Sequence, residues 1–322
     1  MNNYKQLSDR ERYLIEQYLN VDQLGVNQIA IKLNRSKSTI SREIKRNSTN
    51  SEYESNSAIF NAKNRELLKH DLTIPKYTEF LIFFNENYDK KYLGVASCVQ
   101  VAKAQNIETP SSRTMYNWIN NYWLGLKPKD LLRTRQVFFR KSQAKPRVFG
   151  TLPTDATPIS FRPTYINDRS EEGHYEIGLV ISSGQRNTGL LTLVERKTRM
   201  GYVTKVYGKH MQHINEKLEF LIHQYKLNIK SITKDNGMEF NSLFKLKEKY
   251  DFRLYTCNPY ASSEKGTNEN FNGIIRRTFP KGTNFSNIPD NEIQLVIERI
   301  NKMPRMILGW KLSQELFETY NY

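Results

Sequence analysis

The sequence predicts an α/β core with a mixed five-stranded sheet, preceded by all-α units. Two observations carry this prediction. Short apolar segments rich in β-branched residues alternate with amphipathic helical patterns from about residue 174 to residue 257, whereas roughly the first 120 residues show helical patterns only. With 322 residues the chain is long enough for two or three domains with their own cores. We expect helical units at 1–65 and 66–123, a basic linker at 124–165 and the α/β core at 166–322.

The charge balance points to a polyanionic partner. Lysine and arginine number 49 against 33 acids, a formal net charge of +16, and nucleic acid is the usual partner of so basic a chain. Cys98 and Cys257 form neither a CxxC metal motif nor a disulfide framework, which fits a reducing compartment. The N-terminal stretch lacks the apolar segment of a secretory signal, and no apolar run reaches ~18 residues. We therefore expect a cytoplasmic protein with no membrane partner.

The first unit has the pattern of a helix-turn-helix. Ser8 and Glu11 form a capping box that starts one helix, residues 25–34 form a second, and residues 36–47 form a third after a tight turn. Three short helices with a tight second connection are typical of this DNA-binding motif. The unit is therefore expected to bind DNA.

The third helix carries a basic face. At about 100° per residue, Ile40 and Ile44 point toward the core. The opposite face presents hydroxyl and cationic side chains: Ser38, Arg42, Lys45 and Arg46. Arginine reads guanine edges or phosphates, and serine and lysine position the helix, so we assign these four residues to DNA binding in the major groove. A solvated helix face is the alternative.

Residues 66–123 and the linker after them are less informative. In the helix at 109–123 an apolar stripe is expected to be mostly core: Met115, Trp118, Ile119 and Tyr122. Between positions 124 and 150 one acid, Asp130, stands against eight basic residues: Lys127, Lys129, Arg133, Arg135, Arg140, Lys141, Lys145 and Arg147. Such a segment neutralises phosphates without reading bases, although a solvated linker has the same composition.

The elements of the core follow a defined order. Three strands joined by short turns are followed by a helix, a strand, a second helix and a fifth strand, at 174–182, 187–195, 200–206, 211–225, 229–234, 240–249 and 252–257. A helix carrying Glu269 comes next, and a last helix spans about 291–302. Three strands, helix, strand, helix, strand is the order of a ribonuclease-H-like fold.

Two carboxylates are placed to meet at the edge of this sheet. Asp235 follows the buried strand in an Asp-Asn-Gly turn, and sites of α/β proteins usually form at the carboxyl ends of strands. Glu269 lies 34 positions later in the first turn of a helix, far enough for the chain to return beside Asp235. Two acids held together repel unless a cation such as Mg²⁺ lies between them. A turn aspartate and a helix-start glutamate with separate local roles are the alternative.

Four motifs give the chain a family resemblance. TLVERKTR at 192–199, KDNGMEF at 234–240, NPYASSEKGTNENFNGIIRRTFPKGT at 258–283 and NKMPRMILGWK at 301–311 resemble the DDE transposases of bacterial insertion sequences, above all the family conventionally numbered thirty. The resemblance implies a ribonuclease-H-like integrase core, an N-terminal helix-turn-helix and a second one within 71–123, where a plain packing bundle is the alternative. It also implies Mg²⁺ or Mn²⁺ at Asp235 and Glu269. The implied partner is double-stranded DNA with inverted repeats and a target site, bound by a homo-oligomer at the nucleoid of a bacterial cell.

The sequence departs from this family at the first of its three acids. Members usually read GHWE, one variable residue and Asp in the first strand, whereas this chain reads GHYEIG at 173–178, with Gly178 in the place of Asp. Glycine has no ligand atom, so we expect lower metal occupancy and a rate reduced by orders of magnitude. Glu176, two residues earlier on the same strand face at roughly 6.5 Å, is a candidate substitute.

Two functions stay open. The chain is either a transposase that cleaves and joins transposon ends by two-metal phosphoryl transfer, impaired by Gly178, or a catalytically silent DNA-binding repressor or inhibitor derived from one. A nuclease of other function on this fold is a third interpretation, disfavoured by the length of the resemblance. Lys265 and Arg276 flank Glu269 and are assigned to the DNA backbone, with plain surface charge as their alternative.

Overall fold

The structure is a computed structural model that describes residues 6–49, 52–132, 156–182, 188–207, 211–259 and 261–320. The chain divides into two compact units, Met1–Leu81 and Ile82–Tyr322. Most of the expected linker lies outside the described residues, including six of its eight basic residues: Arg133, Arg135, Arg140, Lys141, Lys145 and Arg147.

Three short helices open the first unit, as predicted, and a hairpin and a long helix complete it. In chain order the elements are α1 (Asp9–Glu16), the π-helical turn η1 (Gln17–Val21), α2 (Val26–Lys32), α3 (Lys37–Asn47), β1 (Ser48–Thr49), β2 (Glu52–Tyr53) and α4 (Ser55–Lys76). Helix α4 runs across position 65, where the sequence placed the end of the first unit, so the compact unit extends further than that prediction.

Polar side chains fix the ends of these helices. Ser8 Oγ accepts a hydrogen bond from the amide of Glu11, and the Glu11 carboxylate accepts one from the amide of Ser8 at 2.7 Å, which confirms the predicted capping box. Ser36 caps α3 by accepting from the amide of Thr39. In the turn before α3, Arg35 Nε lies 2.6 Å from Glu11 Oε1, and this hydrogen bond lowers the pKa of Glu11 to about 2.

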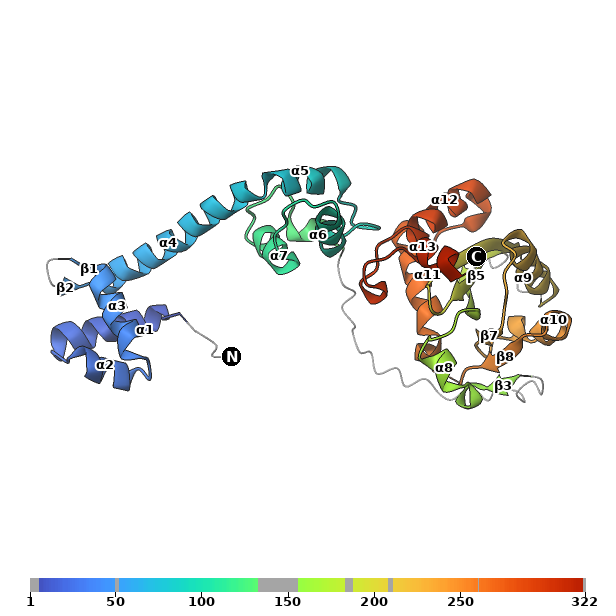
Figure 1. The fold of residues 1–322 in the computed structure, drawn as a ribbon, viewed down its shortest axis with the longest axis horizontal. Helices are drawn as coiled ribbons and strands as arrows, with labels where there is room; N and C mark the ends of the chain where they lie inside the picture. The colour runs from blue at the N-terminus through green and yellow to red at the C-terminus, as the bar shows by residue number, and fades with distance from the viewer. Residues whose placement is uncertain are drawn as a thin grey trace. The chain divides into compact units, whose positions relative to one another are not determined.

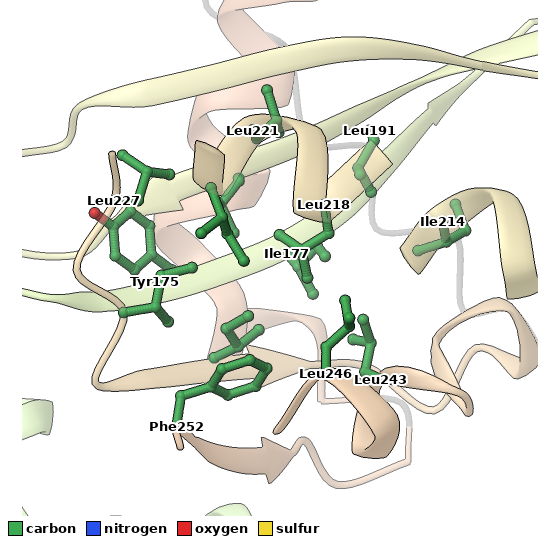
Figure 2. Packing of buried hydrophobic residues seen from close by; sticks show 14 of the residues in the cluster. Tyr175, Ile177, Leu191, Ile214, Leu218, Leu221, Leu227, Leu243, Leu246 and Phe252 are labelled. Carbon is green, nitrogen blue, oxygen red and sulfur yellow. The ribbon is translucent and has the colours of Figure 1, made fainter. Parts of the chain in front are cut away.

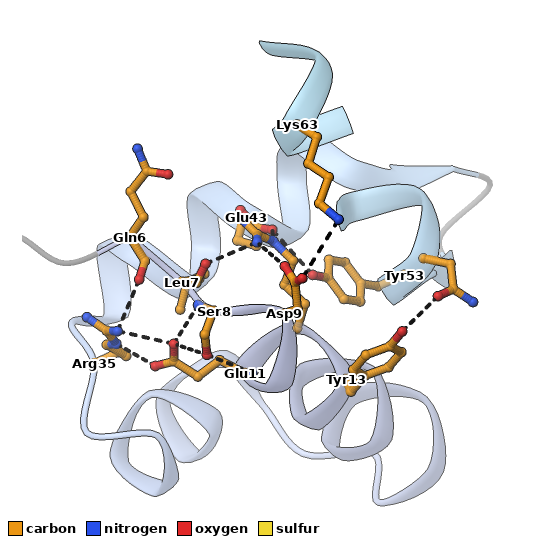
Figure 3. A network of polar contacts seen from close by, with 12 residues as sticks. Gln6, Leu7, Ser8, Asp9, Glu11, Tyr13, Arg35, Glu43, Tyr53 and Lys63 are labelled. Atoms are coloured by element: carbon orange, nitrogen blue, oxygen red, sulfur yellow. Dashed lines mark hydrogen bonds and ion pairs between the residues drawn. The ribbon is translucent and has the colours of Figure 1, made fainter. Parts of the chain in front are cut away.

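A buried ion pair joins α1 to α3, and Figure 3 labels its glutamate, Glu43. Arg12 Nε lies 2.7 Å from Glu43 Oε1, and a second nitrogen of the same guanidinium donates to the carbonyl of Leu7 at 3.0 Å. Both side chains of the pair are buried. They border the apolar core of the unit: Leu7, Ile15, Ile29, Ala30, Ile40, Tyr53 and Ala58. The pair therefore holds α3 in a fixed orientation against α1.

Three helices precede the sheet: α5 (Thr78–Asn87), α6 (Val95–Ala104) and α7 (Ser112–Asn120). Met115, Trp118 and Ile119 of α7 are buried, as predicted. Tyr122 is exposed, so its assignment to the core is wrong. The helix ends at Asn120, and Tyr122 has a left-handed backbone with φ of 60°, which takes it off the helical stripe.

A six-stranded mixed sheet forms the core of the second unit (Figure 1). Its strands are β3 (Thr157–Pro158), β4 (His174–Ile181), β5 (Thr188–Glu195), β6 (Gly201–Tyr207), β7 (Ser231–Lys234) and β8 (Arg253–Thr256). The order is β3-β8-β7-β4-β5-β6, with β4, β5 and β6 antiparallel and the other neighbours parallel. Five strands confirm the predicted mixed sheet. The sixth, β3, has two residues in the expected linker, too few to produce a periodic pattern.

Helices cover both faces of this sheet (Figure 1). Helices α9 (Met211–Gln224) and α10 (Leu243–Tyr250) pack with one apolar cluster, and α11 (Gly266–Thr278) and α12 (Asp290–Asn301) with another. Strand β4 supplies both clusters, because its side chains alternate between the faces. Tyr175 and Ile177 enter the first cluster, shown in Figure 2, and Val180 enters the second.

Short elements complete the chain. They are α8 (Thr164–Asn167), α13 (Ser313–Tyr320) and the 3₁₀ turns η2 (Pro128–Asp130), η3 (Ile159–Phe161), η4 (Met238–Phe240), η5 (Ser262–Lys265), η6 (Phe285–Asn287) and η7 (Met306–Leu308). Helix α13 was not predicted, and its Phe317 packs against the first cluster. Among the described residues, no helix has both the length and the apolar character needed to cross a membrane.

Candidate active site

The end of β7 meets the middle of β4. The two strands run parallel, with Glu176 opposite Thr233. Continuing this register by two residues brings Asp235, directly after β7, level with Gly178 of β4. The amide of Gly237 donates to Asp235 Oδ1 at 2.9 Å. The predicted turn therefore holds the Asp235 carboxylate at the carboxyl end of the strand.

Helix α11 brings Glu269 to the same place. Glu269 lies in its first turn, and Phe271, Ile274 and Ile275 anchor the helix on the sheet. Gly201 of β6 permits this approach, because a Cβ there would lie 2.1 Å from the ring of Phe271. The first turn of α11 is thereby held close to β4.

Gly178, Asp235 and Glu269 line one cavity of about 650 Å³. The other lining residues come from β4, the turn after β7, the segment after β8 and α11: Leu179, Asn236, Gly237, Glu239, Cys257, Asn258, Pro259, Ala261, Lys265, Asn268 and Asn272. The structure thus brings together the two carboxylates that the spacing predicts to converge. In the described part of the chain, no group of three or more His, Cys, Asp or Glu side chains is placed to hold a metal ion.

A lysine already faces one of these carboxylates. Lys265 Nζ lies 2.7 Å from Asp235 Oδ2 and donates to the carbonyl of Ile177 at 2.9 Å. The Lys265 side chain is 7% exposed, whereas that of Asp235 is 48% exposed. The assignment of Lys265 to the DNA backbone stays a prediction. Its ammonium lies in the wall of the cavity and is already paired with Asp235.

The residues assigned to DNA binding on α3 share one exposed face. Ser38, Arg42, Lys45 and Arg46 are all exposed, and Ile40 on the other side of the helix is fully buried. Arg42 Nε donates to the carbonyl of Ser38 at 3.0 Å, so its guanidinium lies along the helix. The cationic face that the helical angle predicts is therefore present and accessible.

Comparison with known proteins shows to which family the chain belongs. A model described as a helix-turn-helix domain matches residues 3–47, which contain α1, α2 and α3. The chain is 33% identical to a probable transposase for insertion-like sequence element IS1161 of Streptococcus salivarius, across 98% of this chain and 95% of the relative. It is 30% identical to the transposase InsI for insertion sequence element IS30A of Escherichia coli (strain K12), across 92% of this chain and 79% of the relative. The chain belongs to the IS30 family of insertion-sequence transposases.

Solved structures similar to this transposase include integrase catalytic cores. The catalytic core domain of BIV integrase matches with a TM-score of 0.37 at 15% identity, over 46% of this chain and 95% of that chain. The catalytic core domain of HTLV-2 integrase in complex with magnesium, in its trimeric form, matches with a TM-score of 0.35 at 18% identity, over 44% of this chain and 93% of that chain.

An asparagine side chain lies against the position of the family's first acid in this transposase. Gly178 lies in the wall of the cavity. A Cβ at this position would lie 2.2 Å from Asn268 Oδ1 and 3.1 Å from Asn268 Cγ. A residue larger than glycine at this position would therefore require the Asn268 amide to move. Sequence reasoning did not single out Asn268, and its place directly before Glu269 was its sole signal.

Glu176, the candidate substitute for the missing acid, is engaged elsewhere. It is fully buried and forms an ion pair with Arg196, and its Oε2 accepts from the amide of Asn268 at 2.9 Å. Burial lowers the pKa of Arg196 to about 10, and the charge of Glu176 opposes that shift. Both carboxylate oxygens have partners, and Glu176 does not line the cavity. This placement gives no support to Glu176 as a metal ligand.

Arg276 is also occupied by the protein itself. One terminal nitrogen donates to the carbonyl of Ile181 at 2.7 Å, and the other to the carbonyls of Phe279 and Pro280. These contacts tie the C-terminal end of α11 to the end of β4. Burial lowers the pKa of the Arg276 guanidinium. Its assignment to the DNA backbone stays a prediction, and the contacts give it a structural role as well.

Proposed function

We propose that this transposase binds the terminal inverted repeats of its insertion sequence and cleaves and joins DNA strands in the cavity of Asp235 and Glu269, at a rate reduced by Gly178. The observation that carries the proposal is that these three positions line one cavity. Two carboxylates near the carboxyl end of an inner strand suit phosphoryl transfer, in which positioning and charge stabilisation supply most of the catalysis.

Asp235 and Glu269 would hold a divalent cation, Mg²⁺ or Mn²⁺. Carboxylate oxygens are the donors that these ions prefer, and a phosphate oxygen of the substrate usually joins them. The chemistry that such a cation would supply is activation of the attacking water or 3′-hydroxyl and stabilisation of the leaving oxygen. Lys265 neutralises and orients Asp235 through Oδ2, and the Gly237 amide fixes Oδ1. The carboxylate is therefore held in place before any substrate arrives.

Recognition of the repeats is assigned to α3. Its exposed cationic face suits the major groove, where arginine reads bases and lysine neutralises phosphates. The net charge of +16 adds binding that does not depend on sequence and weakens with salt. The proposal includes self-association on paired ends, so that each end meets a cavity, and action in the bacterial cytoplasm at the nucleoid.

A silent DNA-binding regulator is the second candidate. Two observations favour it: Gly178 supplies no ligand atom, and the Lys265 ammonium already neutralises Asp235. A chain of this kind would occupy the repeats through α3 without cutting them. It would thereby inhibit active relatives that read the same repeats.

A strand-cleavage and joining assay on DNA carrying the flanking repeats tests the proposal. With Mn²⁺ we expect slow cleavage by the unmodified chain and none by Asp235→Asn or Glu269→Gln. Both variants should retain repeat binding in a gel-shift assay, because α3 is untouched. Cleavage that survives Asp235→Asn would reject the proposed site. Specific repeat binding without cleavage by the unmodified chain would favour the silent regulator.

A further inference from the structure

Three arginines of the second unit have no role in the function proposed so far. Arg199 ends the motif at 192–199, Arg305 lies within the motif at 301–311, and Arg169 lies two residues after α8. We call these three residues the arginine cluster. Arg199 is 8% exposed, and the other two are partly exposed.

Hydrogen bonds bring the segments of Arg199 and Arg305 together beside α11. One terminal nitrogen of Arg199 donates to Thr267 Oγ1 at 3.2 Å, in the first turn of this helix. Asn301, four residues before Arg305, accepts from the amide of Gly201 at 3.0 Å and donates to the carbonyl of Gly201 at 2.9 Å. The turn between β5 and β6 is thereby fixed to the first turn of α11 on one side and to the end of α12 on the other.

Arg169 reaches the same place through the turn after α8. The carbonyl of Ile166 accepts from the amide of Arg169 at 3.3 Å and from Arg196 Nε at 3.3 Å. Arg196 lies three residues before Arg199 in the turn between β5 and β6. The pKa of Arg199 is lowered first by burial and then by the charge of Arg169. The two guanidiniums are therefore near enough to repel each other.

The cluster lacks hydrogen-bond acceptors. The Nε atom of each of its three arginines is buried and has no acceptor among the described residues. None of the three forms an ion pair within the part of the chain that the structure describes. A buried N–H group without an acceptor is unfavourable in the folded state, so a ligand is one explanation for three of them in one place.

Counter-charge is also missing at Arg305. One of its terminal nitrogens donates to the carbonyl of Ile300 at 3.3 Å. Burial, followed by the charges of Arg199 and Arg277, lowers the pKa of Arg305 to about 10, and no carboxylate opposes this shift. A buried cation that is surrounded by like charge destabilises the protein unless an anion joins it.

The two carboxylates near Arg199 are engaged elsewhere. Glu176 is paired with Arg196. Glu195 Oε2 accepts from the amide and the hydroxyl of Thr198, at 2.6 and 2.7 Å. Glu195 Oε1 has no hydrogen-bond partner among the described residues, so no arginine of the cluster bonds to it. Both acids reduce the repulsion around Arg199 without supplying the missing acceptors.

A phosphate group has the properties that the cluster needs. It carries negative charge and several oxygen acceptors, and its geometry matches that of guanidinium groups. The first turn of α11 adds the positive end of a helix dipole. The same turn carries Glu269, so DNA that enters the cavity lies close to the cluster.

We propose that Arg169, Arg199 and Arg305 form a binding site for one backbone phosphate of the transposon-end DNA, beside the cavity in which the strand is cut. This inference rests on the proposed function, because it takes that DNA as the ligand. The phosphate supplies the counter-charge and the acceptors that the cluster lacks. The three arginines therefore destabilise the free protein and stabilise its complex with DNA.

The sign of a stability change separates this site from a structural role. Without DNA, Arg305→Met should raise the Tm of the full chain, because it removes a buried charge that has no partner. A guanidinium that merely holds the fold together would lower the Tm when it is removed. Lys302→Met, which replaces an exposed lysine three positions earlier, is the control and should leave the Tm unchanged.

Binding of transposon-end DNA gives the second readout. Arg305→Met should bind this DNA about tenfold more weakly than the unmodified chain, because a charged hydrogen bond is lost. The dependence of affinity on salt should decrease by about one unit of slope. A lower Tm together with unchanged DNA affinity would overturn the proposal.

Single methylphosphonates in the DNA locate the phosphate, because each removes one backbone charge. One position should weaken binding by the unmodified chain about tenfold and binding by Arg305→Met by less than about twofold. If every position affects both chains equally while the unmodified chain still cleaves, the inference fails and the proposed function stands. If inorganic phosphate at constant ionic strength protects the unmodified chain alone and no methylphosphonate separates the two chains, the ligand is a free anion and the inference is wrong. If the unmodified chain does not bind transposon-end DNA, both fail.

Discussion

The ammonium group of Lys265 lies 2.7 Å from Asp235 Oδ2, on the carboxylate that would bind a divalent cation. A lysine at this place and a divalent cation compete for the same oxygen. Because the pair is half-exposed on the aspartate side, the competition is modest, and it depends on salt.

Lys265→Met should tighten cation binding. The substitution removes the competing charge and keeps an apolar stem of similar length. We expect the affinity for Mn²⁺ to rise about fivefold at low salt, because a partly exposed ion pair contributes up to ~1 kcal/mol. Titration followed by electron paramagnetic resonance measures this, and Lys265→Arg is the control that keeps the charge. A loss of Mn²⁺ affinity in Lys265→Met would show that Lys265 assembles the site rather than competing in it.

Arg42→Ala should weaken binding to the inverted repeat. Arg42 is exposed on the basic face of α3 and has no carboxylate partner among the described residues. We expect a loss of about 1–3 kcal/mol if it reads a base edge, together with reduced discrimination between repeat and unrelated DNA. Fluorescence anisotropy at several salt concentrations measures both. Lys63→Ala, an exposed lysine on α4, is the control, and an equal loss in that variant would argue against α3 as the reading helix.

Arg12→Met should destabilise the first unit. The substitution leaves Glu43 buried without the guanidinium that lies 2.7 Å from its Oε1. Breaking a buried pair on one side costs about 3–5 kcal/mol, so the unit should unfold at a lower urea concentration. Adding Glu43→Leu should restore most of the loss, because no unpaired charge remains buried.

An exposed pair supplies the comparison for Arg12. The Lys249 side chain, paired with Glu219, is 60% exposed, and Lys249→Ala should change the free energy of unfolding far less than Arg12→Met does. If Arg12→Met and Lys249→Ala have equal effects on the free energy of unfolding, the buried pair does not hold α1 to α3.

The first unit should lose stability in acid through Glu11. Its hydrogen bond to Arg35 lowers the pKa from 4.5 to about 2 in the folded state. Because the folded pKa lies below the unfolded one, the contribution is complete above about pH 4.5 and disappears as the pH falls toward 2. Urea unfolding at pH 7 and pH 3 measures the loss. Glu11→Gln should reduce the difference between the two pH values, and an unchanged difference would assign the acid sensitivity to other carboxylates.

The helices and strands could be predicted because their signals are local. The capping box of Ser8 and Glu11 indicates the start of α1 within four residues, and alternation of apolar residues indicates β4, β5 and β6. The turn after β7 and the first turn of α11 are also local features. The residue pattern alone left separate local roles open for Asp235 and Glu269, and the family resemblance favoured a shared site. Tyr122 shows the limit of this reasoning, because a left-handed residue ends the helical period without a signal that periodicity detects.

The contacts inside the site could not be predicted in the same way. Lys265 pairs with Asp235 because the segment before α11 passes close to the end of β7. Glu176 pairs with Arg196, the residue that directly follows β5. The contact of Asn268 with position 178 depends on how closely α11 packs on the sheet. Sequence spacing does not contain that information. The sequence revealed that a ligand is missing, but not what fills its place.

The packing of Asn268 against Gly178 also affects how this gene can change over generations. An aspartate at position 178 would place its Cβ 2.2 Å from Asn268 Oδ1, so the amide would have to turn aside. In turning, its nitrogen would give up the hydrogen bond to Thr192 Oγ1 that now lies at 2.9 Å. A return of the acid would therefore change the contacts between α11 and the sheet as well as the charge of the cavity.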